Sequence, residues 1–185
     1  MPQNQTLDCA LFLAVDLDDS GAVRRLASAG APINARDPAG ATALIAAACS
    51  GAENALEALL ACGAHIDLVD HAGETALIKA ARHSHLSCLR LLLDASPSLD
   101  VQGFAHGWTA LHWAGVRGNV PAALLLIESG SSLQYPFSKD GPAPIHGALP
   151  LAKDPAFWPM MMAYAEQLSS DASRLPSPRR KPAVA

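Results

Sequence analysis

The sequence predicts an all-α solenoid, a stack of helix-turn-helix units with protruding turns, from three observations. A nine-residue segment recurs four times, at residues 40–48, 73–81, 107–115 and 141–149. One position in it is occupied by Thr42, Thr75, Thr109 and Ala143, so that it advances by 33 or 34 residues at each step. The composition is rich in Ala and Leu but only 5% aromatic, which favours helices. A repeat of this length is typical of stacked supersecondary units.

Each repeat opens with a tight turn and a short helix. A glycine lies two residues before the threonine, where a tight turn requires a positive φ. The hydroxyls of Thr42, Thr75 and Thr109 are placed to cap the helix that follows. Small residues such as Ala47 and Ala80 then let neighbouring helices approach closely. The first half of each repeat is therefore predicted to be a turn followed by a helix.

The second half of each repeat is predicted to be another helix. A break precedes it at residues 50–51, at Ser84 or at residues 118–119. Apolar residues then recur on one helical face; they are Leu56, Leu59, Leu60, Leu89, Leu92, Leu93, Leu124, Leu125 and Ile127. Gly63 and Gly130 follow these helices and are placed to end them in the left-handed conformation.

These residues resemble the ankyrin repeat, whose pattern is D-x-x-G-x-T-P-L-H-x-A-A-x-x-G-H, ending in L-L-x-x-G-A-x-x-N. Asp37 and Asp70 match the opening aspartate, and Asn34, Asp67 and Asp100 match the closing Asn/Asp position. The chain departs from the pattern at the following places: Ala replaces Pro at Ala43, Ala76 and Ala110, Ile replaces His at Ile45 and Ile78, and one extra residue falls near 101–104 and another before Asp140.

The resemblance implies one repeat domain over residues 1–169 and a disordered tail over 170–185. The expected repeats are an N-terminal cap at 5–36, then 37–69, 70–103 and 104–137, and a C-terminal cap at 138–169. In the last repeat, Pro150, Pro155 and Pro159 interrupt the pattern, so its second helix is expected over 160–168. The tail carries Pro176, Pro178 and Pro182 around the basic residues 179–181 and cannot continue a helix.

Charge and hydropathy limit the classes of function. The net charge of -4 opposes binding to nucleic acid. No signal peptide is recognised at the start of the sequence, and no apolar run reaches the length of a membrane span. Cys9, Cys49, Cys62 and Cys88 lie far apart and are expected to stay reduced. The sequence therefore predicts a cytoplasmic, monomeric protein that does not engage membranes.

The sequence predicts no catalytic site, no metal and no cofactor. His112 and His146 occupy the histidine position of the repeat, where the family uses imidazole as a structural group. No pair of histidines has the spacing of a zinc site on one helical face. No P-loop, nucleophile elbow or dinucleotide fingerprint is present. The chain is therefore predicted not to be an enzyme.

The resemblance implies that a partner protein binds to the concave face and the turn tips of the stack. The positions that are exposed and variable in the family predict the partner-binding residues, which are Trp108, His106, Arg117, Arg82, His83, Glu74 and His71. Trp108 is the principal candidate, because interface hot spots are enriched in Trp and Arg. The alternatives are that Trp108 folds over Tyr135, Phe137 or the extra loop, and that the cationic residues form a solvated helix end.

Two other functions stay open at this point. The basic tail could make the chain a regulatory factor that associates with nucleic acid, in which case binding would weaken steeply with salt. An enzyme using Cys49 or a histidine would require a thiol of depressed pKa in a pocket. The leading hypothesis is an adaptor or inhibitor that docks a protein partner.

Overall fold

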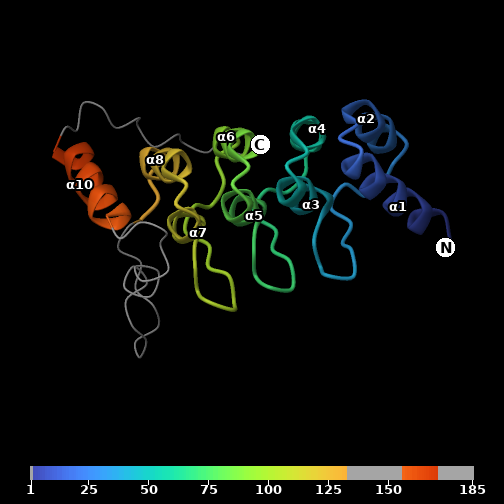
Figure 1. The fold of residues 1–185 in the computed structure, drawn as a ribbon. Helices are drawn as coiled ribbons and strands as arrows, with labels where there is room; N and C mark the ends of the chain where they lie inside the picture. The colour runs from blue at the N-terminus through green and yellow to red at the C-terminus, as the bar shows by residue number, and fades with distance from the viewer. Residues whose placement is uncertain (1, 133–155, 171–185) are drawn as a thin grey trace, which may run out of the picture.

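The helices of the computed structural model lie in two layers (Figure 1). The structure describes residues 2–132 and 156–170. The inner layer contains α1 (Pro2–Asp16), α3 (Ala43–Ser50), α5 (Ala76–His83) and α7 (Ala110–Arg117). The outer layer contains α2 (Ser20–Ser28), α4 (Glu53–Ala61), α6 (Leu86–Asp94) and α8 (Val120–Glu128), and α10 (Phe157–Ser170) packs against α8. From α1 to α6, each helix packs on its counterpart in the next repeat, and the predicted all-α solenoid is confirmed.

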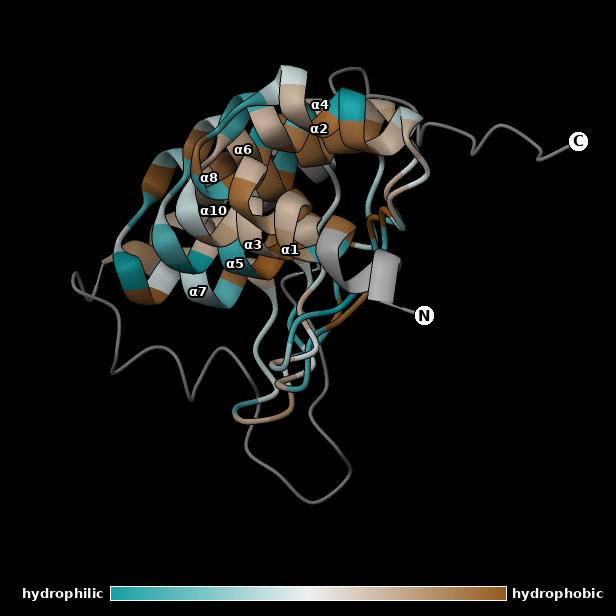
Figure 2. Ribbon diagram, turned by 90° about the vertical axis from the view of Figure 1, so that its right-hand side faces the viewer, coloured by the Kyte–Doolittle hydropathy of each residue, from teal (hydrophilic) through white to brown (hydrophobic). Residues whose placement is uncertain are grey.

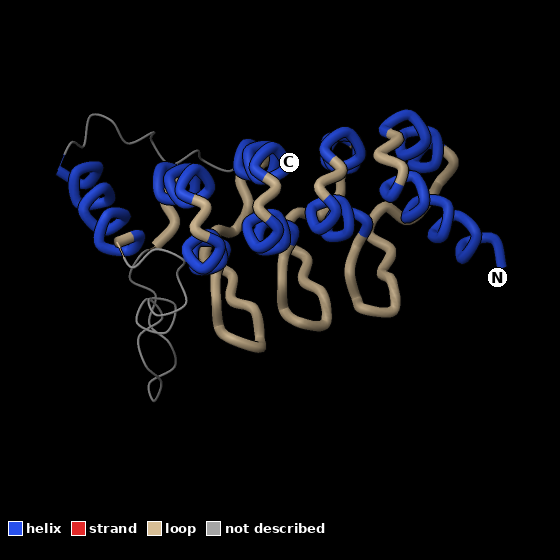
Figure 3. Tube along the Cα trace, viewed as in Figure 1, coloured by secondary structure: helices blue, strands red, loops and turns tan. Residues whose placement is uncertain are grey.

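The loops between the outer and the next inner helix project from the stack as fingers (Figure 3). Figure 2, which is turned by 90°, shows the fingers superimposed on the same side of the inner layer. Asp37 and Asp70 shape the fingers, since the Oδ1 atom of Asp70 accepts hydrogen bonds of 2.9 Å from the backbone N–H groups of Ala72 and Glu74. Asp37 Oδ1 makes the equivalent bonds of 2.8 Å in the preceding finger. The first two fingers are thus each held by an aspartate that caps its own turn.

The threonine of each repeat begins an inner helix as predicted. Thr42 Oγ1 accepts a hydrogen bond from the backbone N–H of Ile45 (3.4 Å), and Thr75 Oγ1 accepts one from Ile78 (3.3 Å). Thr109 forms a capping box with His112, whose Nδ1 accepts from the Thr109 backbone N–H at 3.3 Å. These bonds satisfy N–H groups that have no partner inside the helix.

Small residues let the inner helices lie close together. Ala47, Ala48, Ala80, Ala81 and Ala114 are fully buried where α3, α5 and α7 pack on one another. Larger aliphatic residues fill the space between the layers; they include Leu44, Leu56, Leu59, Leu77, Leu89, Leu92, Leu111 and Leu126. The core therefore continues along the stack.

The closing Asn/Asp position links successive repeats. Asn34 Oδ1 accepts from the backbone N–H of His65 (2.9 Å), and Asp67 Oδ1 accepts from that of Ser98 (2.7 Å). Asp100 Oδ1 accepts from Ser132 at 3.0 Å. The same residue position thus makes the same bond three times, one repeat apart.

The last helix begins earlier than predicted. The sequence indicated a helix over 160–168, but α10 begins at Phe157 and includes Pro159. Pro159 lies in the first turn, where the missing N–H would have no helical partner. His146, Tyr135 and Phe137, the first part of the last repeat and the tail from residue 171 lie outside the described residues. The boundaries proposed for the domain and its repeats stay predictions.

No helix among residues 2–132 and 156–170 combines the length and the apolar character needed to span a bilayer.

Candidate partner-binding surface

Equivalent residues of the inner helices form two rows along the inner layer of the stack. The row four residues after the cap position contains Leu13, Ala46, Lys79 and Trp113. The row eight residues after it contains Leu17, Ser50, His83 and Arg117. Because α1, α3, α5 and α7 pack side by side in that order, each row passes from repeat to repeat. These rows and the finger tips form the surface described below.

An aromatic cluster lies where the third finger, between α6 and α7, meets α7. The ring centroids of Trp108 and Trp113 are 5.0 Å apart with the ring planes at 75°, an edge-to-face contact. The His106 ring lies 4.8 Å from that of Trp108. Trp108 is half-buried and Trp113 is 8% exposed, whereas His106 is exposed. Trp108 therefore packs against Trp113 and keeps part of its indole accessible.

Trp113 was missed by the sequence reasoning, although its position carried a signal. It occupies the row that holds Ala46 and Lys79 in the preceding repeats, and it is the large aromatic residue of that row. Trp113 belongs to the buried core and supports Trp108 from below, and a bulky ring at a position that varies between repeats could have pointed to this contact.

A buried charge network lies beside this cluster and corrects one predicted site residue. Glu74 was expected to be exposed for partner contact, but it is only 5% exposed. Its carboxylate forms ion pairs with Lys79 and with Arg82, the latter at 3.0 Å. Lys79 Nζ also lies 2.8 Å from Asp70 Oδ2. Glu74 is therefore a structural residue that fixes Lys79 and Arg82, because a buried carboxylate is stable only when paired.

The pKa values of this network follow from its pairing. Burial alone would raise the pKa of Asp70, but the hydrogen bonds from Lys79 and from two backbone N–H groups lower it below 3.8. Burial alone would lower the pKa of Lys79, but Asp70 and Glu74 raise it above 10.5. Both groups are thus charged at neutral pH, and the network of two carboxylates and two cations is neutral in sum.

Arg82 joins the charge network to the aromatic cluster. Its guanidinium carbon lies 4.5 Å from the centroid of the Trp113 ring, within the range of a cation–π contact. Arg117 Nε donates a 2.7 Å hydrogen bond to the backbone carbonyl of Arg82, and Arg117 is exposed. Among the described residues no carboxylate lies within 4.0 Å of the Arg117 guanidinium. Arg117 therefore presents a positive charge that the described chain does not neutralise.

The predicted residues His71 and His83 occupy different surroundings. His71 is exposed at a finger tip, and its ring lies against Gly40 of the preceding finger. Phe104 repeats this arrangement one finger later against Gly73; it is 75% exposed and was also missed from the sequence. His83 is exposed at the end of α5, and burial of its ring and the positive charges around it, led by Arg82, lower its pKa below 6.5. His83 is therefore neutral at pH 7.

Cys49 and two histidines meet between α3 and α5. Cys49 Sγ lies 3.6 Å from His83 Nε2, and His85 Nε2 lies 3.1 Å from the Cys49 carbonyl oxygen. Within residues 2–132 and 156–170, no three His, Cys, Asp or Glu side chains gather closely enough to hold a metal ion. The contacts of Cys49 with His83 and His85 tether the second repeat to the third.

The thiol of the buried Cys88 is unreactive, because burial raises its pKa to about 11.

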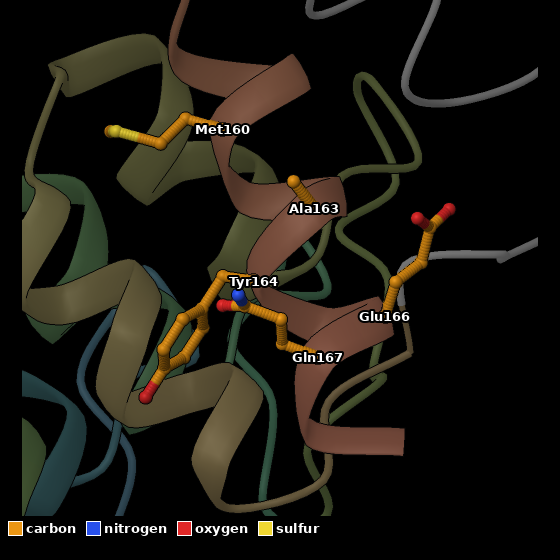
Figure 4. A pocket seen from close by; sticks show the side chains of 5 residues that line it. All are labelled: Met160, Ala163, Tyr164, Glu166 and Gln167. Atoms are coloured by element: carbon orange, nitrogen blue, oxygen red, sulfur yellow. The ribbon is translucent and has the colours of Figure 1, made fainter. Parts of the chain in front are cut away.

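A shallow hollow lies on α10 (Figure 4). Its described lining comes from this one helix, namely Met160, Ala163, Tyr164, Glu166 and Gln167. The hydroxyl of Tyr164 donates a 2.7 Å hydrogen bond to Glu128 Oε1 and so ties α10 to α8. This open surface brings together no set of groups suited to catalysis, and the two rows and the finger tips remain the candidate site.

The stacked helix pairs and the projecting fingers define a repeat solenoid. Residues 2–70 and 54–136 match the family model for ankyrin repeats, with three copies. The match spans more than half of the sequence, and the chain belongs to the ankyrin-repeat family. Ankyrin repeats generally mediate protein–protein interaction and are typically not enzymes. No curated protein matches the chain.

Proposed function

We propose that this protein is a scaffold, an adaptor or inhibitor that binds a partner protein through its inner face and finger tips. The observation that carries the proposal is the half-buried Trp108, packed on Trp113 and flanked by the exposed His106. An indole that is fixed by one neighbour and open on another side loses little entropy when it binds. We place the centre of the interface at this cluster, with Arg117 at its border.

The same proposal covers the remaining properties. The protein acts by binding alone, without catalysis, as a monomer and in the cytoplasm. Support for binding without catalysis comes from the open inner face and from the behaviour of the family. The fixed positions of Trp113 and Arg82 support a rigid surface, because such a surface lowers the ordering cost of association.

An affinity pull-down from cells of the source organism tests the proposal. The bait proteins are the wild type, the double variant Trp108→Ala/Arg117→Ala and the control Arg90→Ala, whose residue is exposed on the outer helix α6. We expect a protein that the wild type and the control recover and the double variant loses. Circular dichroism of all three baits establishes that they are equally folded. A partner retained by the double variant would move the site away from the inner face, and recovery of nucleic acid alone would contradict the proposal.

A further inference from the structure

The two rows of inner-face residues change in character from one end of the stack to the other. At the first repeat, Leu13 is 58% exposed and Leu17 is 70% exposed. At the second repeat the same positions carry the small residues Ala46 and Ser50. At the fourth repeat they carry Trp113 and Arg117. The inner face thus has an apolar end, a middle with small side chains, and an end that is aromatic and cationic.

The charges of the inner face are distributed with the same polarity. Asp16 lies exposed at the apolar end, one turn from Leu13. Beyond the middle, Lys79 and Arg82 are balanced by Asp70 and Glu74. Arg117 adds a cation that no described carboxylate neutralises.

His83 lies near this end, and burial of its ring and then the positive charges around it, Arg117 among them, lower its pKa. The fourth-repeat end is therefore suited to carboxylates, and the first-repeat end disfavours them.

The separation of the two ends sets the length of a ligand that reaches both. Three helix-to-helix steps, from α1 to α3 to α5 to α7, span roughly 24–30 Å at the usual interaxial distances. This distance corresponds to roughly 16–20 residues of an α-helix. In extended conformation it corresponds to about 7–9 residues. A single peptide segment of about 20 residues can therefore contact both ends in either conformation.

We propose that the inner face docks an acidic segment of a partner protein, which runs along the stack with its carboxylates at Arg117 and an apolar side chain on Leu13 and Leu17. This inference rests on the proposed function and gives it a ligand chemistry and a direction. Trp108 and Trp113 contact the segment beside its acidic part. The small residues of α3 accommodate the middle of the segment, where Ala46 and Ser50 leave room above the helix.

A displayed library of random 20-residue peptides, selected on the full-length protein, tests this ligand chemistry. We expect the enriched sequences to carry clustered Asp or Glu residues toward one end and a Leu, Ile, Phe or Met residue toward the other. A synthetic consensus peptide is then titrated against the wild type and variants. Arg117→Glu is expected to weaken binding by at least about ten-fold, because it replaces attraction by repulsion.

Two matched variants control for changes that are not local. Arg90→Glu on the outer helix α6 changes the net charge by the same amount as Arg117→Glu, and should leave the affinity within about two-fold. Leu17→Ser should weaken the binding of the peptide. Met160→Ser also removes an exposed apolar side chain and should leave this binding unchanged. Thermal unfolding of each variant shows that the fold is retained.

The other outcomes separate the ligand chemistry from the proposed function. The proposal that the docked segment is acidic is overturned if the enriched peptides lack acidic residues. It is also overturned if Arg117→Glu and Arg90→Glu change the peptide affinity equally. If peptides without acidic residues bind the Trp108→Ala variant more weakly than the wild type, the inner face remains a protein-binding surface. Peptides that no inner-face variant affects overturn both proposals. A library that yields no binder also overturns the docking of a linear segment.

Discussion

At the scale of single residues, the buried Glu74 fixes part of the inner face. Glu74 fixes Arg82 by a pair of 3.0 Å contacts, and Arg82 in turn lies over the ring of Trp113. The buried Glu74 carboxylate thereby helps to fix the orientation of Arg82 over the aromatic cluster. The candidate surface and the stability of the third repeat are thus coupled through one buried group.

Glu74→Gln is expected to lower the free energy of unfolding by about 2–3 kcal/mol. The substitution removes the charge that compensates Lys79 and Arg82 in a largely buried setting, while the shape of the side chain is kept. Urea unfolding measures the change. Glu57→Gln, at an exposed position on α4, is the control and should stay within about 0.5 kcal/mol of the wild type. Equal effects of the two substitutions would contradict the structural role of Glu74.

His112 makes stability depend on pH. Burial lowers the pKa of His112 from 6.5 to about 4, so the unfolded chain binds a proton between these values that the folded chain does not. The contribution of His112 to the free energy of unfolding is therefore fully present above pH 6.5. It decreases by about 3 kcal/mol in total as the pH falls toward 4. His112→Gln preserves the capping box with Thr109 but does not titrate. Urea unfolding at several pH values should give a smaller decrease for the variant, and parallel curves would refute the assignment.

The sequence could propose a candidate site but could not show how its members are arranged. The positions that are exposed and variable in the ankyrin family gave Trp108, His106 and Arg117 as candidates. It could not show that Glu74 turns inward, since only the meeting of Lys79 and Arg82 makes burial of that carboxylate favourable. It also could not show that Trp113 supports Trp108, because that contact depends on how the finger folds back on α7.

At the scale of helices, the ends are set by a few residues with special backbone geometry. Thr42 and Thr75 begin α3 and α5, and the sequence predicted both. The residue after α3 and the residue after α5 adopt a left-handed conformation, with φ of 80° at Gly51 and 63° at Ser84. The early start of α10 at Phe157 was not predicted, because a proline in the first turn reads in sequence as a break.

Ser84→Gly is expected to stabilise the protein by about 0.5–1 kcal/mol. A side chain in the left-handed conformation is strained, and glycine removes this strain at some cost in the entropy of the unfolded chain. Gly118 holds the equivalent position after α7 with φ of 66°, so Gly118→Ser should change stability in the opposite direction. Thermal unfolding of the pair checks both signs. A destabilised Ser84→Gly variant would show that the hydroxyl has a role at this turn.

At the scale of the whole molecule, contacts between helices run mainly between neighbouring repeats along the stack. In the described residues, α1, α3, α5 and α7 pack on one another in that order and each on its own outer partner, and α10 packs on α8. Stability in such an array is approximately the sum of repeat terms and nearest-neighbour terms. A substitution therefore acts according to its position in the stack.

Phe157→Ala and Leu89→Ala should differ in the extent of the region they loosen. Both side chains are at most 1% exposed, and each truncation costs roughly 2–5 kcal/mol locally. Phe157 lies on α10 at one end, so hydrogen exchange should increase in α8 and α10 only. Leu89 lies on α6 in the interior, so exchange should increase on both sides of it. Equal exchange profiles would indicate a single cooperative unit.

The contacts between adjacent repeats also bear on how the chain acquires its structure during synthesis. Every helix pair in the described stack joins segments that are close in the sequence, such as α1 with α3 or α4 with α6. Low contact order of this kind shortens the loops that must close before native contacts form. The first two repeats can therefore pack while later residues are still on the ribosome, and each new repeat can add to a surface that already exists.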